Sequence, residues 1–381
     1  NGAGKHNNWS IATNDGQNLL NPGSTPMENL QFLTFLCAVI KGVDEYADLL
    51  RISAASAAND HRLGANEAPP AIISIFMGEE LQGVLDALVS GDTYTSQSMT
   101  FKIGVDALPD FPKDSTDRNR TSPFAFTGNR FEFRMVGSSE NIACPNHMLN
   151  TIVASELSDI ADKMEKVPAD KFKDELKKLL AEIVKEHKRV IFNGDGYSDA
   201  WVEEAERRGL PNIRSMVDAI PALITPKAVK LFESFGVFTE AELKSRAEIK
   251  YEAYAKAINI EAKTMIDMAG KQIIPSVISY TTELANSVLT VKDAGADASV
   301  QADLLAEVSG YLKDMKAAYT KLIDVTSKAA AIDDIVAQAT YFRDEVKTTM
   351  DELRAPADKL EMIVDKEFWP FPSYGDLLFE V

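Results

Sequence analysis

Cysteine and histidine are scarce in this chain of 381 residues, which contains two of the former and four of the latter. The two cysteines, Cys37 and Cys144, exclude a disulfide framework, and without a Cys-x-x-Cys pair they do not indicate a zinc site. This cysteine usage predicts a reducing, cytoplasmic setting. The longest apolar run, LQFLTFLCAVI, is too short to cross a bilayer, and the sequence shows no signal peptide. We therefore expect no membrane partner.

Positive charge is also in short supply. The chain has 40 Lys and Arg against 58 Asp and Glu, which gives a formal net charge of -18. Nucleic acid and anionic membranes are bound through Lys and Arg, so we expect neither as a partner. ATP stays possible, because a local group of arginines with a bound divalent cation reverses the local potential. With 45% hydrophobic and 26% charged residues, the chain is typical of a globular protein of two or three domains.

The opening stretch NGAGKHNNWS has the glycine and lysine of a phosphate-binding loop but lacks the rest of it. Such a loop places Ser or Thr after Gly-Lys to hold Mg²⁺, whereas Gly4 and Lys5 are followed by His6. Taken by itself, the stretch is interpreted as a glycine-rich turn with a surface lysine. A lone histidine is more often structural than a ligand, and His61, His147 and His187 keep that interpretation.

The first 150 or so residues mix helical and strand patterns. Apolar residues at helical spacing predict a helix over 26–54. A strand is predicted in APPAIISIFMGEEL, where β-branched and aromatic residues follow Pro70 and Gly78 interrupts the run. Between these two elements, NDHRLGANEAPP is a loop that carries Arg62 and Glu67. Charged loop residues are usually only solvated, but functional residues also concentrate on loops.

From about residue 143 onward the pattern is helical. Ser198 is predicted to cap a short helix in FNGDGYSDAWVEEAERRG. Two long segments, 239–289 and 297–366, flank the loop VKDAGADAS and predict an antiparallel helical hairpin. The aromatic and proline residues of the terminal FWPFPSYGDLLFEV predict a tail docked on a surface. The expected fold class is α+β, with a mixed part followed by a mostly helical region.

Four arginines gather within seventeen residues of this acidic chain. In GNRFEFRMVGS, charged and apolar residues alternate, which predicts a half-buried strand with Arg130, Glu132 and Arg134 on one face. Arg118 and Arg120 lie just upstream. Guanidinium groups suit phosphate or carboxylate oxygens, and a carboxylate among them is useful if a divalent cation is bound. The alternative is a ladder of surface ion pairs, each contributing about 0–1 kcal/mol.

Taken in order, the stretches NGAGKHNNWS, HRLGANEAPP and RNRTSPFAF…GNRFEFRM resemble the second half of a type III glutamine synthetase catalytic domain. The family's Asn-Gly-x-Gly-x-His loop matches residues 1–6, and its R-L-x-x-x-E-A-P flap matches 62–69, about one residue shorter than in the common type. The R-N-R-(S/T) and R-(I/F)-E-(V/F)-R motifs match 118–121 and 130–134. VIFNGDGYSDAWVEEAERRGLPN and WPFPSYGDLLFEV resemble type III, so the resemblance covers the whole chain.

The resemblance implies three parts for this α+β chain. Residues 1–150 would be the C-terminal part of a barrel-like α/β catalytic domain, 151–256 its helical completion, and 257–381 a type III helical hairpin with a docked tail. The family's β-grasp domain and first barrel strands, which supply further metal ligands and an aspartate for the neighbouring subunit, have no counterpart in the sequence. The chain is therefore expected to be the C-terminal half of a longer one and inactive alone. The family's stacked hexameric rings imply a homododecamer with sites between subunits.

The activity implied is ATP-dependent ligation of ammonia to L-glutamate, through a γ-glutamyl phosphate intermediate. By resemblance, His6 and Glu132 would be ligands of Mg²⁺ or Mn²⁺, for which a nitrogen and an oxygen ligand are suitable. Asn1 and Gly2 would hold the amino end of glutamate. The co-substrate and partners implied are ATP, glutamate, ammonia and further copies of the chain.

The resemblance also assigns catalytic groups. Arg62 and Arg134 would bind carboxylate and phosphoryl oxygens, where bidentate contacts fix orientation. Arg120 would stabilise charge on the phosphoryl group. Glu67 would close the glutamate entrance and act as a general base toward ammonium.

Nucleotide contacts are implied for Asn8, Ser10, Arg120 and Arg130. The sequence departs from the common type at two of the nucleotide-contacting positions. Asn8 replaces a histidine, and Ala125 stands where a further arginine is found. Contacts to the nucleotide are therefore expected to differ.

Two other functions stay open at this point. A related carboxylate–amine ligase would keep the ATP and metal residues but use another acid or amine. A non-catalytic assembly or regulatory protein derived from a glutamine synthetase would use the helical hairpin as a binding surface. The intact Arg, Glu and His set argues against the second, because a scaffold has no physical need for clustered arginines.

Overall fold

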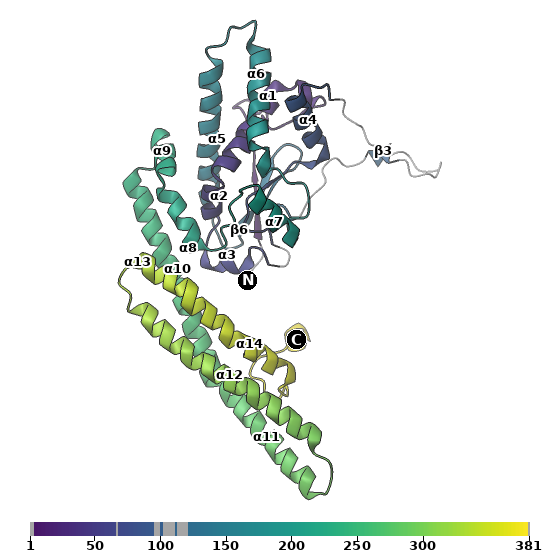
Figure 1. Cartoon of the computed structure of the whole chain (residues 1–381), viewed down its shortest axis with the longest axis vertical. Coiled ribbons are helices and arrows are strands. Elements are labelled where there is room, and N and C mark those ends of the chain that lie inside the picture. Colours follow the sequence, from purple (N-terminus) through teal and green to yellow (C-terminus); the bar gives the residue numbers. More distant parts are fainter. Residues whose placement is uncertain (1–3, 66–67, 95–99, 102–110, 113–120, 380–381) are drawn as a thin grey trace. The chain divides into compact units, whose positions relative to one another are not determined.

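The computed structural model describes residues 4–65, 68–94, 100–101, 111–112 and 121–379. The chain divides into two compact units, unit 1 over residues 1–247 and unit 2 over 248–381 (Figure 1). Unit 1 combines a small sheet with helices and unit 2 is helical, which confirms the α+β prediction. Among the described helices, none is both long and apolar enough to cross a membrane.

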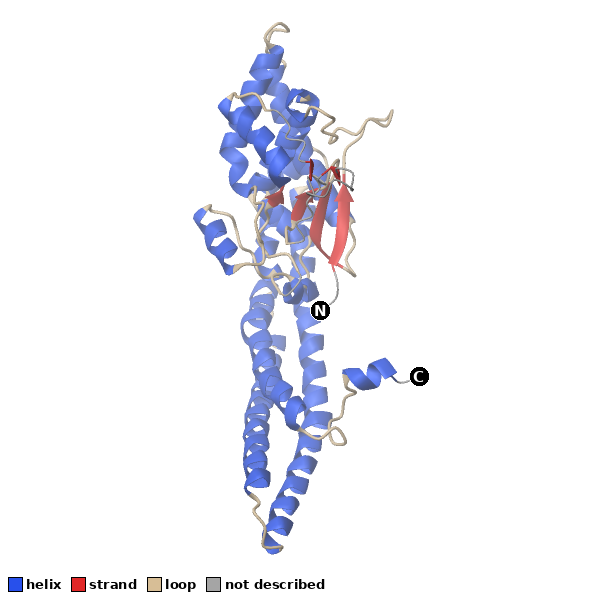
Figure 2. Ribbon diagram, turned by 90° about the vertical axis from the view of Figure 1, so that its right-hand side faces the viewer, coloured by secondary structure: helices blue, strands red, loops and turns tan. Residues whose placement is uncertain are grey.

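The sheet of unit 1 joins the start of the chain to residues near 130 (Figure 2). Its strands, in spatial order, are β1 (Gly4–Trp9), β6 (Phe131–Gly137), β5 (Phe124–Phe126) and β2 (Ile75–Phe76). β6 pairs antiparallel with both β1 and β5, and β2 pairs parallel with β5. A separate two-stranded ladder joins β3 (Thr100–Phe101) and β4 (Phe111–Pro112). The central position of β6 places its residues between two neighbours.

One face of this sheet is aromatic. Phe124 stacks on Phe131 with ring centroids 4.8 Å apart, and Phe126 contacts both Phe131 and Phe32 of the first long helix. All these rings are buried. The alternation predicted for this segment is thus confirmed on its apolar side, and the charged residues lie on the other face.

Unit 1 also contains helices, the last of which, α10, continues into unit 2. In chain order they are η1 (Pro26–Glu28), α1 (Leu30–Glu45), α2 (Ala47–Ser53), α3 (Ala57–Arg62), α4 (Gly78–Ser90), α5 (Ala143–Met164), α6 (Phe172–His187), η2 (Lys188–Val190), α7 (Asp199–Arg207), α8 (Met216–Ala219), η3 (Ile220–Ile224), α9 (Pro226–Ser234) and α10 (Glu240–Met268). Helix α1 packs against both α5 and α6, as Figure 1 shows.

The prediction of one helix over 26–54 is wrong. Asn29 caps α1 by accepting a hydrogen bond from the Phe32 amide at 3.1 Å, and Tyr46 leaves helical geometry before α2 begins. The Lys227 ammonium lies over the Tyr46 ring, 4.0 Å from its centroid. Apolar spacing continues across such a one-residue break, so the pattern alone does not register it.

The strand predicted in APPAIISIFMGEEL is confirmed only for Ile75–Phe76. The four preceding residues are buried, but within them only Ile72 makes an isolated bridge, to Asn212. Gly78 then adopts a φ of 77° and begins α4, a conformation that favours glycine.

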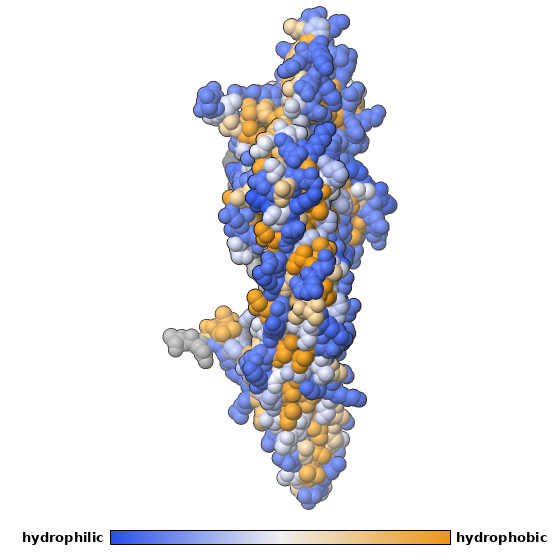
Figure 3. Space-filling model, turned by 90° about the vertical axis from the view of Figure 1, so that its left-hand side faces the viewer, coloured by the Kyte–Doolittle hydropathy of each residue, from blue (hydrophilic) through white to orange (hydrophobic). Residues whose placement is uncertain are grey.

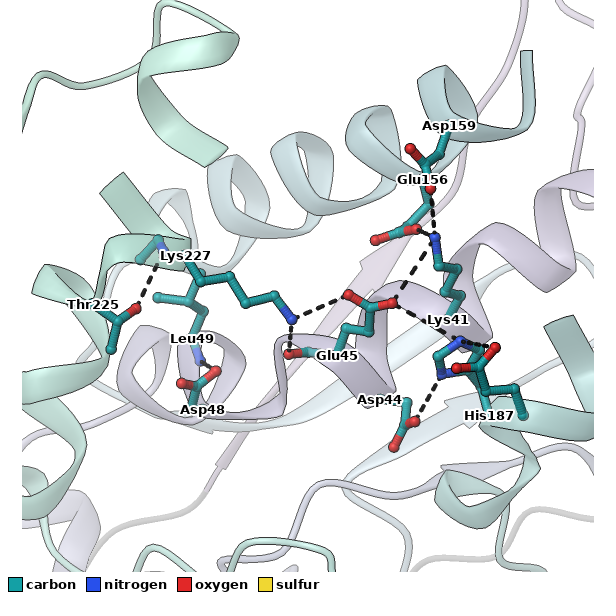
Figure 4. Close-up of polar contacts among 12 residues, drawn as sticks. Lys41, Asp44, Glu45, Asp48, Leu49, Glu156, Asp159, His187, Thr225 and Lys227 are labelled. Atoms are coloured by element: carbon teal, nitrogen blue, oxygen red, sulfur yellow. Dashed lines mark hydrogen bonds and ion pairs between the residues drawn. The ribbon is translucent and has the colours of Figure 1, made fainter. Parts of the chain in front are cut away.

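A network of charged side chains joins α1, α5, α6 and α9 (Figure 4). The His187 imidazole lies 2.8 Å from the Asp44 carboxylate, which also accepts from Arg189 Nε at 2.8 Å. Both Asp44 and His187 are buried. Burial alone would lower the pKa of the Lys41 ammonium, but its hydrogen bonds to Glu156 and Asp159 raise it above its usual value. These pairs connect segments far apart in the sequence.

Unit 2 is built from long helices. They are the continuation of α10, the π-helical turn η4 (Ala269–Ile273), α11 (Ile274–Asp293), α12 (Ser299–Ala330), α13 (Ile335–Tyr341), the π-helical turn η5 (Phe342–Val346), α14 (Lys347–Ile363) and α15 (Tyr374–Phe379). Figure 3 shows apolar residues among hydrophilic ones along these helices on the face in view. Helices α11 and α12 pack against each other on either side of the predicted loop.

The prediction of a single second arm over 297–366 is wrong. After α12 the chain turns, and the Asp334 carboxylate accepts a hydrogen bond from the Ala337 amide at 2.8 Å to cap α13. The chain then runs back so that α14 packs on α12. The terminal aromatic segment contacts the bundle through Phe368, whose ring lies 5.5 Å from that of Tyr280, whereas Phe379 at the end of α15 is 81% exposed.

Candidate functional site

A β-bulge lies at the centre of the candidate site. The β1–β6 ladder pairs Lys5 with Val136 and then Asn7 with Phe133. His6 therefore faces two residues of β6, Arg134 and Met135, instead of one. Bulges re-aim side chains and release backbone groups from the ladder, and they are common next to functional sites.

Two residues of β1 fix which face His6 occupies. The Asn7 side-chain Nδ2 donates to Asn146 Oδ1 at 2.8 Å, and the Trp9 indole donates to Asn150 Oδ1 at 2.9 Å. Both acceptors lie on α5. The Asn7 and Trp9 side chains are buried, while His6 and Asn8 are exposed. Because side chains alternate along a strand, anchoring Asn7 and Trp9 on the helix turns their neighbours toward the opposite face.

The Glu132 carboxylate is the point at which the charged side chains converge. Its Oε2 atom lies 3.5 Å from His6 Nδ1 and accepts from Arg134 Nη2 at 3.1 Å and Nε at 3.3 Å. Glu132 and Arg134 are 8% and 4% exposed, whereas the His6 side chain is 61% exposed. The strand is therefore buried on its charged face too, which corrects the prediction of a half-buried strand. A buried carboxylate needs such partners because desolvation is costly.

Arg62 is held against the bulge. Its Nη1 donates to Asn59 Oδ1 at 2.8 Å and to the Met135 carbonyl at 3.1 Å, and its Nη2 donates to the Arg134 carbonyl at 3.0 Å. The guanidinium fills the space beside Gly4, where a Cβ would clash with it. Burial lowers the pKa of the Arg62 guanidinium, which nevertheless stays charged in proteins. Arg62 is thus fixed against the backbone of Arg134 and Met135.

The residues with implied nucleotide contacts lie at the other end of β1. Ser10 donates to the Asn129 carbonyl at 3.2 Å, and Arg130 is exposed at the turn that leads into β6. Asn8 stands opposite Glu132 on one side, and Ala125 stands opposite it on the other. Ala125 is fully buried, so its small side chain lies within the row that contains the carboxylate.

Four of the predicted site residues, Asn1, Gly2, Glu67 and Arg120, lie outside the described residues. The structure brings together His6, Glu132, Arg134 and Arg62 near the bulge, and Asn8, Ser10 and Arg130 lie along the same two strands or the turn beside them. Their roles stay predictions.

The donor set at this site suits part of a metal centre. Within the described residues, no group of three or more His, Cys, Asp and Glu side chains could hold an ion. His6 and Glu132 offer one imidazole nitrogen and one carboxylate. Mg²⁺ is often held by one or two protein groups together with phosphates and water, so two such ligands fit an ion that is shared with other groups.

Sequence reasoning missed one contributor, Asn59. Asn59 is buried and donates to the Met135 carbonyl at 2.7 Å while accepting from Arg62. Its position three residues before Arg62 on α3 was the available signal, because residues three apart share a helix face. Outside this group, the Gly196 amide donates to Thr121 Oγ1, although 75 residues separate the two. No local pattern indicates that contact.

Comparison with known proteins agrees with the motifs. Residues 175–292 match the glutamine synthetase C-terminal domain family. The whole chain is 42% identical over 387 residues to a glutamine synthetase of Butyrivibrio fibrisolvens, of which it covers 55%. It is 41% identical to the type-3 glutamine synthetase of Dictyostelium discoideum and 37% identical to a glutamine synthetase of Bacteroides fragilis (strain YCH46), covering 53% and 54% of them. The chain spans about half the length of the curated relatives it matches.

Proposed function

We propose that this chain, which is related to the glutamine synthetases over its whole length, acts as part of an enzyme that ligates ammonia to L-glutamate. ATP phosphorylates the γ-carboxylate of glutamate, and ammonia then displaces phosphate from the γ-glutamyl phosphate. The observation that carries the proposal is the convergence of His6 and Arg134 on one oxygen of the buried Glu132. A chain used only as a scaffold has no need to bury a carboxylate at an exposed imidazole.

His6 and Glu132 would hold a Mg²⁺ or Mn²⁺ ion at this point. Such an ion neutralises charge on the transferring phosphoryl group. Arg134 keeps the carboxylate oriented through Nε and Nη2, and the hydrogen bonds of Asn7 and Trp9 to α5 keep His6 on the same face. His6 and Glu132 are the two protein ligands proposed among the described residues, and phosphate oxygens, water and further protein groups would complete the coordination.

Arg62 and Arg134 bind the anionic groups of the substrates. Within the described residues, hydrogen bonds engage three of the five N–H groups of Arg62, which leaves Nε–H and one Nη2–H for a substrate oxygen. Asn1 and Gly2 hold the amino end of glutamate. Glu67 takes a proton from ammonium, and Arg120 stabilises phosphoryl charge.

Asn8, Ser10 and Arg130 contact the nucleotide. The exposed position of Asn8 and Arg130 near Glu132 supports this role, since the phosphates of ATP must reach the metal ion. The complete enzyme is a homo-oligomer, a dodecamer of two hexameric rings with sites between subunits, in a cytoplasmic setting.

The test begins with the intact mass of the native polypeptide that contains this sequence, followed by its phosphate release from ATP. We expect a mass well above 41.8 kDa and phosphate release that requires both glutamate and ammonia. Release that requires another acid or amine would indicate a related carboxylate–amine ligase. A native mass near 41.8 kDa without ATP turnover would indicate an assembly or regulatory protein and overturn the proposal.

A further inference from the structure

The Asn59 side chain connects Arg62 to the bulge of the β1–β6 ladder. Asn59 and Arg62 lie three residues apart on the short helix α3, and residues at this spacing share one face of a helix. Ser56 caps α3 by accepting a hydrogen bond from the Asn59 backbone amide at 3.3 Å. Asn59 is only 2% exposed, so its polar atoms need partners within the protein.

The hydrogen bonds of the Asn59 carboxamide determine which of its atoms faces Arg62. Its Nδ2 donates to the Ala54 carbonyl at 2.5 Å and to the Met135 carbonyl at 2.7 Å, which uses both of its N–H groups. Its Oδ1 accepts from Arg62 Nη1 at 2.8 Å. A carboxamide turned the other way would place its N–H groups against those of the guanidinium and its oxygen against two carbonyl oxygens. The Asn59 oxygen therefore has one favourable direction, toward Arg62.

The Arg62 guanidinium is in turn oriented within its own plane. Its Nη1 and Nη2 donate to the carbonyls of two adjacent residues, Met135 and Arg134, so the edge that these two nitrogens share faces the bulge. Nη1 also donates to Asn59. Within the described residues, the Nε–H and one Nη2–H stay available. An edge formed by Nε and Nη2 binds a carboxylate through two parallel hydrogen bonds.

Two roles of the Asn59 side chain can be separated. Its Nδ2 satisfies backbone carbonyls, as a residue that only supports the fold would do. Its Oδ1 serves the Arg62 guanidinium. An arginine side chain has several rotatable bonds, so presenting one edge to a ligand costs entropy unless the protein holds that edge in place beforehand. The Oδ1 contact is therefore the one that bears on ligand binding.

We propose that Asn59 is a positioning residue that holds Arg62 so that its Nε and Nη2 edge faces a carboxylate of the amino-acid substrate. The inference rests on the proposed function, in which Arg62 binds anionic groups of the substrates. It adds that affinity for the amino acid depends on a buried residue that acts through the guanidinium and does not itself contact the substrate.

The test measures the dissociation constants of L-glutamate and of ADP with Mg²⁺ by titration calorimetry on the full-length enzyme. Asn59→Leu keeps the branched shape of the side chain but removes the acceptor for Arg62. We expect the dissociation constant of glutamate to rise about 10-fold, which is the scale of one hydrogen bond to a charged group. The dissociation constant of ADP should stay unchanged.

The control is Thr349→Val in unit 2. It also removes a buried side-chain hydrogen bond, which Thr349 Oγ1 donates to the Glu345 carbonyl at 2.8 Å. This variant should lower the unfolding temperature without changing either dissociation constant. It therefore separates the loss of a buried hydrogen bond in general from the loss of the bond that orients Arg62.

A double-mutant cycle with Arg62→Lys tests whether Asn59 acts through Arg62. A lysine has a single nitrogen and cannot present the edge of a guanidinium. Adding Asn59→Leu to Arg62→Lys should therefore leave the dissociation constant of glutamate where Arg62→Lys placed it. If Asn59→Leu weakens glutamate binding by the same factor in both backgrounds, Asn59 supports the fold independently of Arg62 and the proposal is overturned.

Asn59→Asp keeps the test decisive if Asn59→Leu does not fold. Its carboxylate retains an acceptor for Arg62 but offsets the guanidinium charge, so glutamate should again bind more weakly while ADP binding is unchanged. If folded Asn59→Asp binds glutamate as the unmodified enzyme does, or if both ligands weaken equally, the role of Asn59 is rejected while the proposed function stands. If the unmodified full-length enzyme binds no glutamate, the proposed function fails and this role fails with it.

Discussion

The two units use charged residues in different ways. Unit 1 contains buried ion pairs, such as Arg51 with Asp60 and His187 with Asp44, and the second joins residues distant in sequence, although unit 1 also has exposed pairs within one helix, such as Lys178 with Glu175. In unit 2, most of the described pairs are exposed and join residues four apart on one helix, such as Lys328 and Asp324. Exposed helical pairs contribute about 0.3–0.5 kcal/mol, whereas breaking a buried pair costs about 3–5 kcal/mol. The difference predicts where the chain tolerates change and where it does not.

The largest effect is expected at the buried carboxylate of the candidate site. Glu132→Gln keeps the shape of the side chain but removes its charge, so the metal should bind poorly and activity of the full-length enzyme should fall at least about 100-fold. A Mg²⁺ titration of the rate measures this. The control is Glu165→Gln, which makes the same change from carboxylate to carboxamide at an exposed residue just after α5. Unchanged metal dependence in Glu132→Gln would contradict the ligand role.

The next effect contrasts the two units directly. Arg51 is 1% exposed and donates to the Ile213 carbonyl at 2.7 Å and to Asp60 at 3.0 Å. Arg51→Ala leaves Asp60 buried without its counter-charge, so the free energy of unfolding of unit 1 should fall by about 3–5 kcal/mol. Arg354→Ala in unit 2 removes only an exposed pair with Asp358 and should cost about 0.3–0.5 kcal/mol.

Hydrogen exchange followed separately in peptides of unit 1 and unit 2 measures both variants. Equal destabilisation by Arg51→Ala and Arg354→Ala would contradict the claim that the buried pair of unit 1 contributes more to stability than the exposed pair of unit 2.

A smaller effect is expected at the turn that divides the helical region. Asp334→Ala removes the cap of α13, which should cost about 1 kcal/mol. The neighbouring Asp333→Ala is the control, because the cap bond belongs to Asp334. Thermal unfolding of unit 2, followed by circular dichroism, should separate the two variants. If both variants unfold at the same temperature, the capping hydrogen bond of Asp334 does not stabilise α13.

The smallest effect is expected at α15. The hydrogen bonds of Asp376 to Lys366 and to Ser373 lower the pKa of its carboxyl to about 2. Because the pKa of Asp376 is lower in the folded state, its ionised carboxylate stabilises the folded α15 at pH values above its usual pKa of 3.8. This stabilisation is lost as the pH falls through about 2. Amide exchange over 374–379 should therefore rise selectively between about pH 4 and pH 2, relative to α14. Asp376→Asn should abolish this pH dependence, and a parallel rise in α14 would refute a local origin.

Parts of the candidate site could be predicted because they depend on short spacings. The alternation of Arg130, Glu132 and Arg134 identifies their common face, and the order of the motifs indicates the resemblance to glutamine synthetases. The direction in which the His6 side chain points could not be predicted from the sequence. The bulge that aligns it with Glu132 depends on pairing with a strand more than a hundred residues away. The anchoring of Arg62 by the bulge carbonyls has the same origin.

The errors in the fold have a related cause. Apolar periodicity predicted helices over 26–54 and 297–366 correctly in type, but the breaks at Tyr46 and before Asp334 arise from packing and from a single capping bond. The strand in APPAIISIFMGEEL was shortened because only Ile75–Phe76 meets a partner strand. Propensity states what a segment can form, and the neighbours decide how much of it pairs.

The sequence by itself determined the family resemblance, the α+β class, the charged face of β6 and the cap at Ser198, because each is encoded in residues a few positions apart. Only the tertiary structure decided that Arg62 lies on the bulge and that α14 folds back onto α12. Those features depend on contacts between distant segments, and a local pattern carries no information about which distant segment will supply the partner.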